Sequence, residues 1–237
     1  MLTLRSCRVD ALGQNIRGVT LDVGGTLISP HPSVGHVYAS VAKKLGVGDF
    51  SSELLNKQFV AGWREKGFFD YSLENWRDLV KRSFAGIAPV TDELFNAIYE
   101  EFSHAECWRL YPDVLPLLKE LKDRGVKIAA VSNWDTRLRG LLEAIDLAKH
   151  FDAIIVSAEV GATKPQKAIF EAALKALSLP AEHVLHIGDS EREDFQGARD
   201  AGMMSLLLSR EEQGKVLTKA EAISDLSAVL RILDKPV

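Results

Sequence analysis

The sequence predicts an α/β protein in which a doubly wound, Rossmann-like parallel sheet carries an all-α cap inserted after its first strand. From residue 126 onward, short apolar runs of strand length alternate with segments whose apolar residues recur at helical spacing. These runs are apolar throughout, which is typical of parallel strands that helices cover on both faces. Residues 31–110, in contrast, show amphipathic helical patterns and no convincing strand.

The predicted strands are short apolar segments, and each connection after the cap contains a helical pattern. The strands cover residues 19–23, 126–132, 152–157, 183–189 and 204–209. The helices cover 112–125, a segment with Leu138, Leu141, Leu142 and Ile145 on one face, 164–180 and the short stretch 195–202. Proline near the start and glycine or proline near the end of several of these helices support their boundaries.

The predicted cap is an insertion between the first strand and the rest of the sheet. Three amphipathic helices are expected in it, in "SELLNKQFVAGW", "SLENWRDLVKRSF" and "TDELFNAIYEEF", with Ser72 and Thr91 as N-caps. The predicted domains are therefore a core of residues 18–30 and 111–237 and a helical cap of residues 31–110. We expect hinges at Pro30–Gly35 and Tyr111–Pro112.

Composition and charge favour an ordinary globular protein. The net charge of −4 is mild and the basic residues are scattered, so neither nucleic acid nor a membrane is an expected partner. No apolar run approaches the ~18 residues of a membrane span. Cys7 and Cys107 form no metal or redox motif, which fits a reducing compartment. Residues 1–18 lack a secretory apolar core, so we expect a cytoplasmic protein, with an organelle transit segment as the alternative. The oligomeric state does not follow from the sequence.

Small polar or charged residues stand where the predicted parallel strands end. Ligands of such sheets bind outside the carboxyl ends of the strands, so these residues are expected to converge at one edge. They are Asp22 and Thr26 after the first strand, Ser132 and Asn133 after the second, Lys164 after the third, and Asp189 and Asp194 after the fourth. Acids, an amine and hydroxyl groups in one place suit a divalent cation and a phosphoryl group.

Each of these residues also has an ordinary structural explanation when taken alone. Asp22 before two glycines can simply form a turn, and Ser132-Asn133 can cap a helix. A lysine before proline, such as Lys164, is usually a solvated loop charge, and the acids of "GDSERED" suit the start of a helix. The functional interpretation depends on compatible residues following several strands in order.

That order resembles the haloacid dehalogenase-like (HAD) hydrolase superfamily, in its subfamily with a helical cap after the first strand. The segments that carry the resemblance are "LDVGGTL", "VSNWD", Lys164 in "ATKPQKAIF", and "HIGDSEREDFQGARDAGM". The last is the most specific, with Gly-Asp-Ser, a second aspartate five residues later and a Gly-Ala pair. Details such as "SNWDTRL" resemble the branch of the rhythmically expressed gene product and HAD-like hydrolase domain-containing proteins.

The resemblance implies a phosphohydrolase whose nucleophile is Asp22, which would form an aspartyl-phosphate. It also implies Mg²⁺ as the cofactor, held by Asp22, the backbone carbonyl of Gly24, Asp189 and waters, with Asp194 supporting them.

The same resemblance implies the groups that bind a small phosphorylated substrate. Lys164 would offset the clustered negative charge, and Ser132 with the backbone near Asn133 would hold the transferring oxygens. The turn through Gly25 and Thr26 would bring backbone N–H groups to the phosphate.

Gly24 departs from the family pattern, because phosphatases of this family usually carry there a second aspartate that acts as general acid and base. Such assistance contributes about 10²- to 10⁴-fold to the rate. We therefore expect weak activity or a preference for good leaving groups. His31 and His36 are candidate substitutes for the missing acid.

Gly24 also leaves other functions open. One alternative is a catalytically degraded binding or regulatory protein, and further ones are a 2-haloacid dehalogenase and a carbon–phosphorus hydrolase with a cap lysine as Schiff base. Specificity is expected to lie in the cap. The candidate residues there are Trp63, Arg64, Lys66, Trp76 and Arg77, although the spacing of Trp76 also suits the cap core.

Overall fold

The computed structural model describes residues 16–67, 69–210 and 221–234, which form two compact units. Of the described residues, the sheet unit comprises 16–27, 111–133, 147–210 and 221–234, and the helical unit comprises 28–67, 69–110 and 134–146. Cys7 and residues 1–15 of the segment considered as an alternative transit segment lie outside the described residues. Among the described helices, none combines the length and the apolar character that crossing a membrane requires.

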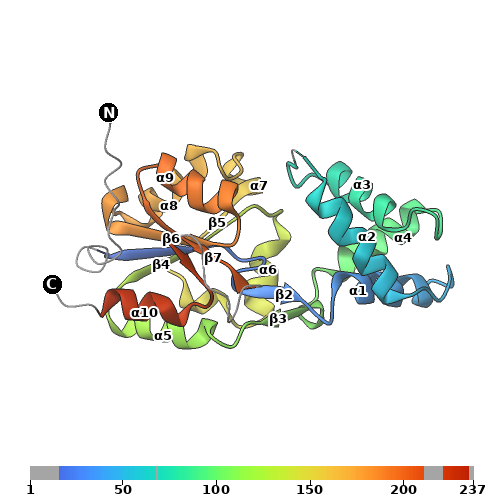
Figure 1. The fold of residues 1–237 in the computed structure, drawn as a ribbon, viewed down its shortest axis with the longest axis horizontal. Helices are drawn as coiled ribbons and strands as arrows, with labels where there is room; N and C mark the ends of the chain where they lie inside the picture. The colour runs from blue at the N-terminus through green and yellow to red at the C-terminus, as the bar shows by residue number, and fades with distance from the viewer. Residues whose placement is uncertain (1–15, 68, 211–220, 235–237) are drawn as a thin grey trace. The chain divides into compact units, whose positions relative to one another are not determined.

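The sheet unit is built on a six-stranded parallel sheet with the order β5-β4-β1-β6-β7-β8 (Figure 1). Its strands are β1 (Gly18–Leu21), β4 (Lys127–Ser132), β5 (Ala153–Val156), β6 (Val184–Gly188), β7 (Met204–Leu208) and β8 (Ala222–Ile223). The predicted strands are confirmed to within two residues at each end. β8 was not predicted, because two residues are too few to show a period.

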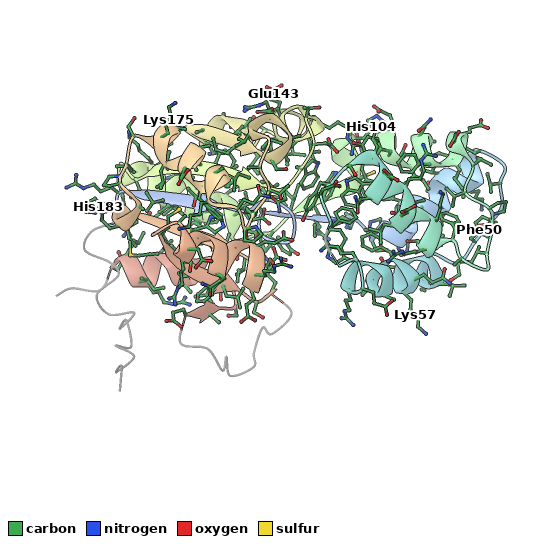
Figure 2. The ribbon with its side chains drawn as sticks, turned by 90° about the horizontal axis from the view of Figure 1, so that it is seen from above. Phe50, Lys57, His104, Glu143, Lys175 and His183 are labelled. Atoms are coloured by element: carbon green, nitrogen blue, oxygen red, sulfur yellow. The ribbon has the colours of Figure 1, made fainter. Side chains whose placement is uncertain are left out.

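Helices cover both faces of this sheet, as the apolar strands predicted. In Figure 1, α5 (Val114–Asp123) and α10 (Ser227–Leu233) lie on one face, and α8 (Lys167–Leu177) and α9 (Gly197–Asp200) lie on the other. The short α7 (Ser157–Val160) follows β5, and the π-helix η5 (Glu191–Gln196) precedes α9. α8 buries Ile169, Phe170 and Ala173 in the core, while its Lys175 points outward (Figure 2). The predicted Rossmann-like fold is confirmed.

The register of β1 determines which residues come together at the carboxyl edge. Leu21, the last residue of β1, pairs with Ala130 of β4 on one side and with Ile187 of β6 on the other. The chain remains extended for one more residue, because the N–H of Asp22 donates to the carbonyl of Ile187 at 2.9 Å. Asp22 therefore leaves the sheet between the ends of β4 and β6.

The helical unit contains four successive capped helices and a short antiparallel ribbon. The helices are α1 (Val34–Lys44), α2 (Ser52–Arg64), α3 (Leu73–Ser83) and α4 (Asp92–Glu101). The side chains of Ser33, Ser51, Ser72 and Thr91 accept a hydrogen bond from the backbone N–H three residues later. The predicted N-caps at Ser72 and Thr91 are confirmed, and these bonds fix where α3 and α4 begin.

Two parts of the helical unit differ from the prediction. β2 (Ile28–Pro30) pairs antiparallel with β3 (Trp108–Leu110), and β3 lies in the region of residues 31–110 that was expected to lack strands. α1 begins where a hinge was expected, and its Val34, Val37 and Tyr38 are buried. These three residues have helical spacing, which the proline-rich start of the segment masked.

The aromatic residues proposed as specificity determinants pack mainly against one another. The rings of Trp63 and Trp76 are stacked with centroids 5.9 Å apart, and Phe69 meets Trp76 edge-on at 5.0 Å. The Lys66 ammonium lies 3.5 Å from the centre of the Trp63 ring, and the Arg77 guanidinium lies over Phe95. Arg64 is exposed. The interpretation of Trp76 as part of the cap core is consistent with these contacts.

Residues 134–146, which the sequence prediction assigned to the core, group with the helical unit. Asp135 accepts a 2.7 Å hydrogen bond from the Tyr99 hydroxyl of α4, and it also pairs with Arg137 at 2.8 Å. The Arg137 guanidinium stacks 3.3 Å from the centre of the Tyr99 ring, and Trp134 contacts Trp108. These contacts tie α6 (Arg137–Ala144) to α4. The predicted boundary of the cap at residues 31 and 110 stays a prediction.

Candidate active site

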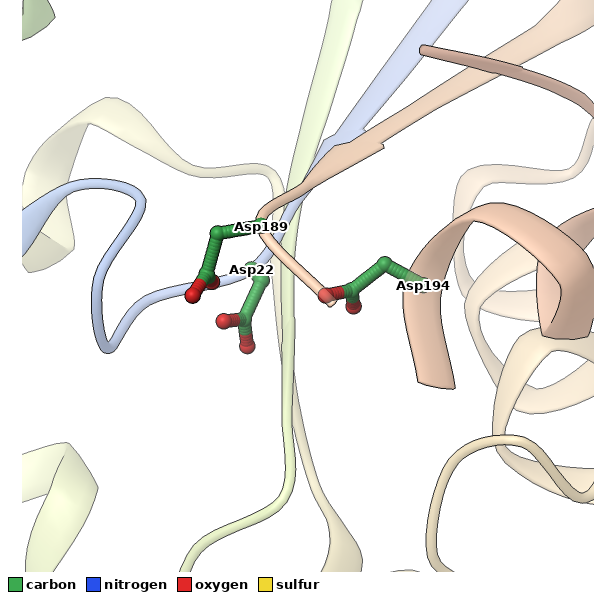
Figure 3. Close-up of side chains that lie close together, drawn as sticks. All are labelled: Asp22, Asp189 and Asp194. Atoms are coloured by element: carbon green, nitrogen blue, oxygen red, sulfur yellow. The ribbon is translucent and has the colours of Figure 1, made fainter. Parts of the chain in front are cut away.

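Three aspartates gather at the carboxyl edge of the sheet unit. Each of Asp22, Asp189 and Asp194 places a carboxylate oxygen within 4.8 Å of the others, which makes them a candidate metal site among the described residues. Figure 3 shows that Asp22 follows β1, Asp189 follows β6, and Asp194 projects toward them from the helix that starts beyond β6. The cluster thus joins the ends of two neighbouring strands, as expected for a parallel sheet.

The π-helix η5 brings Asp194 inward. Ser190 caps this helix by accepting from the N–H of Glu193 at 3.1 Å, and its own N–H donates to Asp194 Oδ2 at 3.0 Å. A β-carbon on Gly188 would lie only 2.1 Å from Asp194 Cγ, so glycine is required there for the carboxylate to approach the strand. Short π-helical segments such as η5 are rare in proteins and occur frequently at functional sites.

Lys164 is the positive partner of this cluster. Its ammonium lies 2.6 Å from Asp22 Oδ1 and 2.5 Å from Asp194 Oδ1, and the residue is only 3% exposed. The interpretation of Lys164 as a solvated loop charge is therefore wrong. The three carboxylates and one ammonium, all ionised, would carry a net charge of −2.

Asn133 and Ser132 hold the two ends of the Lys164–Asp22 pair. The Asn133 side chain accepts from the Lys164 N–H at 2.6 Å and donates to the Lys164 carbonyl at 3.0 Å. It also donates to Glu193 at 3.1 Å. The Ser132 hydroxyl donates to Asp22 Oδ1 at 3.0 Å. Neither residue caps a helix, because α6 begins only after Thr136.

The turn after β1 lies against Asp189. The Thr26 hydroxyl donates to Asp189 Oδ1 at 3.2 Å. Gly25 has a φ of +78°, and a β-carbon there would lie 2.6 Å from Asp189 Oδ2. Glycine at position 25 thus permits the left-handed backbone conformation and leaves room for the Asp189 carboxylate to lie against the turn. Gly24, immediately before it, is half-buried.

The charges of the cluster shift one another's protonation. Burial raises the pKa of Asp22, an effect that the Lys164 ammonium opposes and the Asp194 charge reinforces. Burial also disfavours the charged form of Lys164, but Asp194 and Asp22 outweigh it and raise the pKa of the ammonium. Likewise the pKa of Asp194 lies well below its usual range, because Lys164 and His186 outweigh its burial.

The pKa of Asp189 is shifted in the opposite direction to that of Asp194. Asp189 is exposed, yet the surrounding protein reduces the hydration of its carboxylate. This loss of hydration, together with the charges of Asp22 and Asp194, raises the pKa of Asp189 to about 7. A raised pKa marks a carboxylate that lacks a sufficient positive partner among the protein's own groups.

The donor set fits a hard divalent cation. Magnesium is usually held by one or two carboxylates together with waters, and it prefers oxygen ligands. Asp194 already accepts from Lys164, His186 and the Ser190 N–H, whereas Asp189 accepts from Thr26. The excess negative charge and the raised pKa of Asp189 are what a bound cation would relieve.

Two groups at this edge were missed in the sequence. His186 of β6 is fully buried and lies 3.1 Å from Asp194 Oδ1 through Nε2, and 2.8 Å from the Thr20 hydroxyl through Nδ1. Arg210 donates to the Thr26 carbonyl at 2.6 Å and to both oxygens of Asp113 at 3.0 and 3.1 Å. Histidine within the apolar run "VLHIG" was an available signal, whereas nothing near Arg210 in the sequence marks it.

The two histidines considered as substitute acids have local partners in the helical unit. The ring Nδ1 of His36 lies 2.8 Å from the hydroxyl of Ser33 at the start of α1. The backbone N–H of His31 donates to the Cys107 carbonyl at 2.8 Å. Both side chains are exposed. These contacts assign neither histidine a chemical role.

The fold and this site together define a Rossmann-like protein with an acidic, lysine-containing cluster at the carboxyl edge of its sheet. The chain belongs to the haloacid dehalogenase-like hydrolase family, which it matches over residues 16–202. It is 35% identical over 214 residues to haloacid dehalogenase-like hydrolase domain-containing protein 3 of Mus musculus, a match covering 83% of each chain. The rhythmically expressed gene 2 protein of Drosophila melanogaster is 29% identical over 226 residues and 86% of each chain.

A solved structure shows the same fold. The HAD-hydrolase YfnB of Bacillus subtilis, which was solved bound to magnesium, superposes with a TM-score of 0.75. The alignment covers 93% of this chain and 100% of that one, at 17% sequence identity. The predicted membership in the HAD superfamily, and in the branch of these relatives, is confirmed.

Proposed function

We propose that the protein is a magnesium-dependent phosphohydrolase that acts through an aspartyl-phosphate on Asp22. The observation that supports this most is the setting of the Asp22 carboxylate. It receives hydrogen bonds from the buried Lys164 ammonium and from the Ser132 hydroxyl, and it lies beside Asp189. A carboxylate so oriented at the ligand-binding edge of a parallel sheet is suited to nucleophilic attack.

The proposed reaction has two displacements at phosphorus. An oxygen of Asp22 attacks the phosphoryl group, the bond to the substrate oxygen breaks, and that oxygen leaves with its electron pair. Water then attacks the phosphorus of the acyl phosphate, which releases inorganic phosphate and restores the Asp22 carboxylate. Lys164 balances negative charge, while Ser132 and the backbone N–H groups near Asn133, Gly25 and Thr26 bind the transferring oxygens.

Asp22, Asp189 and the Gly24 carbonyl are the groups proposed to hold Mg²⁺, with Asp194 supporting them through Lys164. The bound cation would supply charge neutralisation at the phosphoryl oxygens. The donor chemistry supports this assignment, because the ligands are all hard oxygens and the unrelieved charge of the cluster is negative.

Gly24 restricts the proposed substrate class. The leaving oxygen receives no proton from position 24, since glycine has no side chain. Loss of a general acid typically lowers the rate about 10²- to 10⁴-fold for a poor leaving group. We therefore propose substrates whose leaving group needs little protonation, such as acyl, anhydride or aryl phosphates.

Gly24 is also the observation that favours a second candidate, a binding or regulatory protein derived from a phosphatase. In that case the carboxylate cluster would retain a ligand without turnover. Beryllium fluoride with Mg²⁺ separates the two, because it mimics the aspartyl-phosphate. A ¹⁹F NMR signal of the bound complex in the wild type that is missing in Asp22→Asn supports the enzyme, whereas no signal in either favours the binding protein.

The activity itself is tested with an aryl phosphate in Mg²⁺ and, separately, in a chelator. We expect hydrolysis that requires Mg²⁺ and that Asp22→Asn abolishes. Unchanged hydrolysis in Asp22→Asn would overturn the proposal. Release of chloride from 2-chloropropionate in the presence of the chelator would instead indicate a 2-haloacid dehalogenase.

A further inference from the structure

A chain of buried polar groups extends from the centre of the sheet to Lys164. The Thr20 hydroxyl lies 2.8 Å from His186 Nδ1, and His186 Nε2 lies 3.1 Å from Asp194 Oδ1. Asp194 Oδ1 in turn accepts from the Lys164 ammonium at 2.5 Å. Thr20 and His186 are both 0% exposed, so no solvent competes for these bonds.

The sheet register fixes the first link of this chain. Thr20 of β1 and His186 of β6 are directly paired residues of neighbouring parallel strands. The edge of the His186 ring also meets the Phe170 ring of α8, with centroids 5.2 Å apart and planes at 86°. Strand pairing places the His186 backbone, and the contact with Phe170 together with the two ring hydrogen bonds restricts the orientation of the imidazole.

The chemistry of Asp194 determines which nitrogen of His186 carries a proton. A carboxylate only accepts hydrogen bonds, so His186 Nε2 must be the donor in this contact. In the neutral ring, Nδ1 is then an acceptor and the Thr20 hydroxyl donates to it. Thr20 thereby fixes the tautomer that presents an N–H to Asp194.

Asp194 receives donors from three directions: Lys164, His186 and the backbone N–H of Ser190. This set holds its carboxylate in one rotamer. Lys164 has a long, flexible side chain, and its other carboxylate partner, Asp22, is the proposed nucleophile. While Asp22 is bonded to a phosphoryl group, Asp194 is the partner that keeps the ammonium in place.

We propose that His186 is a positioning residue: its Nε2–H, oriented by Thr20, holds Asp194 in the geometry that keeps Lys164 at the reacting centre. This inference rests on the proposed function for its kinetic consequences. An apolar pair at these two positions would fill the core without burying polar groups, which favours a role beyond packing. Groups that orient the residues of an active site in this manner typically contribute about 10- to 100-fold to activity or metal affinity.

Two variants with the same amide group test the contact with Asp194. In His186→Gln, the amide nitrogen can take the place of Nε2 and donate to Asp194. In His186→Asn, the shorter side chain reaches only the place of Nδ1, beside Thr20. We expect kcat for an aryl phosphate to fall about 10- to 100-fold in His186→Asn, with KM little changed, and His186→Gln to recover most of that loss.

A structural control separates positioning from packing. Phe170→Leu loosens the aromatic contact with the imidazole and lowers stability, but it leaves the Thr20–His186–Asp194 bonds intact. We expect it to reduce the unfolding midpoint with a kcat close to that of the wild type. Equal kcat in His186→Asn and His186→Gln, or loss of kcat in proportion to stability in all three variants, would overturn the inference.

A second readout does not depend on activity. The Lys164 ammonium should give a slowly exchanging ¹H–¹⁵N NMR signal in the wild type and in His186→Gln, and a broadened or lost signal in His186→Asn. The same signal in all three proteins would refute the positioning role. If the wild type hydrolyses no more aryl phosphate than Asp22→Asn, the proposed function fails, and this NMR comparison still decides the role of His186.

Discussion

The Lys164 ammonium lies 2.6 Å from Asp22 Oδ1 and 2.5 Å from Asp194 Oδ1, and its side chain is 2% exposed. One buried cation thus forms ion pairs with two buried carboxylates that come from different parts of the chain. Removing it leaves both charges without this partner, and an unpaired buried charge is among the most destabilising changes known.

Lys164→Met is therefore expected to destabilise the metal-free protein by about 3–5 kcal/mol and to abolish the proposed activity. Denaturant unfolding at neutral pH measures the first effect. Lys175→Met is the matched control, because Lys175 points outward from α8 (Figure 2), and it should change stability by less than ~0.5 kcal/mol. Equal stability of Lys164→Met and Lys175→Met would show that the ion pairs of Lys164 contribute nothing to the stability of the fold.

Gly25→Ala tests the close approach of the turn to Asp189. Gly161→Ala is its control, since Gly161 has a similar φ of +74° but no atom within 4 Å of the added carbon. The control should lose about 1–2 kcal/mol from backbone strain alone. Gly25→Ala should lose more stability, and also aryl phosphatase activity, because Asp189 must move. Equivalent behaviour of the two variants would contradict the geometry.

The pKa of Asp189 predicts a pH dependence of stability without metal. Between its ordinary value of 3.8 and about 7, folded Asp189 keeps a proton that the unfolded chain releases. Its contribution to stability is thus present below pH 3.8 and is lost as pH rises through about 7. Asp194, with a lowered pKa, acts in the opposite sense and only at lower pH, because its contribution is lost as pH falls below 3.8.

The comparison of Asp189→Asn with the wild type isolates that contribution. We expect the variant to lose less stability than the wild type between pH of about 4 and about 7, when unfolding is followed in a chelator. With saturating Mg²⁺, the stability of the wild type should no longer fall faster with rising pH than that of Asp189→Asn. The reason is that cation binding favours the ionised carboxylate. If the stability of both proteins changed equally with pH in the absence of metal, the pKa of Asp189 would not be raised.

Gly24→Asp tests whether position 24 limits the rate. Restoring a carboxyl group there should raise turnover of an alkyl phosphate by about 10²- to 10⁴-fold, with a smaller effect on an aryl phosphate. The ratio of the two turnover numbers is the measurement. An unchanged ratio would indicate that another group already supplies the proton.

The strands of the sheet unit followed from the sequence because buried parallel strands are continuous apolar runs, which few other elements produce. The positions of Asp22, Ser132 and Asp189 at one edge then followed from topology alone. β8 and the β2–β3 ribbon could not be predicted from the sequence, since strands of two or three residues show no periodic pattern.

The buried network was harder to predict than the fold. Lys164 in a loop before proline resembles any solvated lysine, and its burial depends on two carboxylates distant in sequence. His186 stands within the predicted strand 183–189, but its hydrogen bonds depend on the pairing of β6 with β1, which places it opposite Thr20. The contacts of Arg210 with Thr26 and of Asp135 with Tyr99 join residues that are distant in sequence, so no local sequence pattern predicts them.

The nucleophile assignment to Asp22 is tested most directly by trapping the intermediate. The protein with Mg²⁺ is mixed with an aryl or acyl phosphate, quenched in acid during turnover, digested and examined by mass spectrometry. We expect a phosphorylated peptide that contains Asp22 and that is absent from Asp22→Asn. Turnover of the substrate without any phosphate on Asp22, or with phosphate on a different residue, would contradict the proposed mechanism.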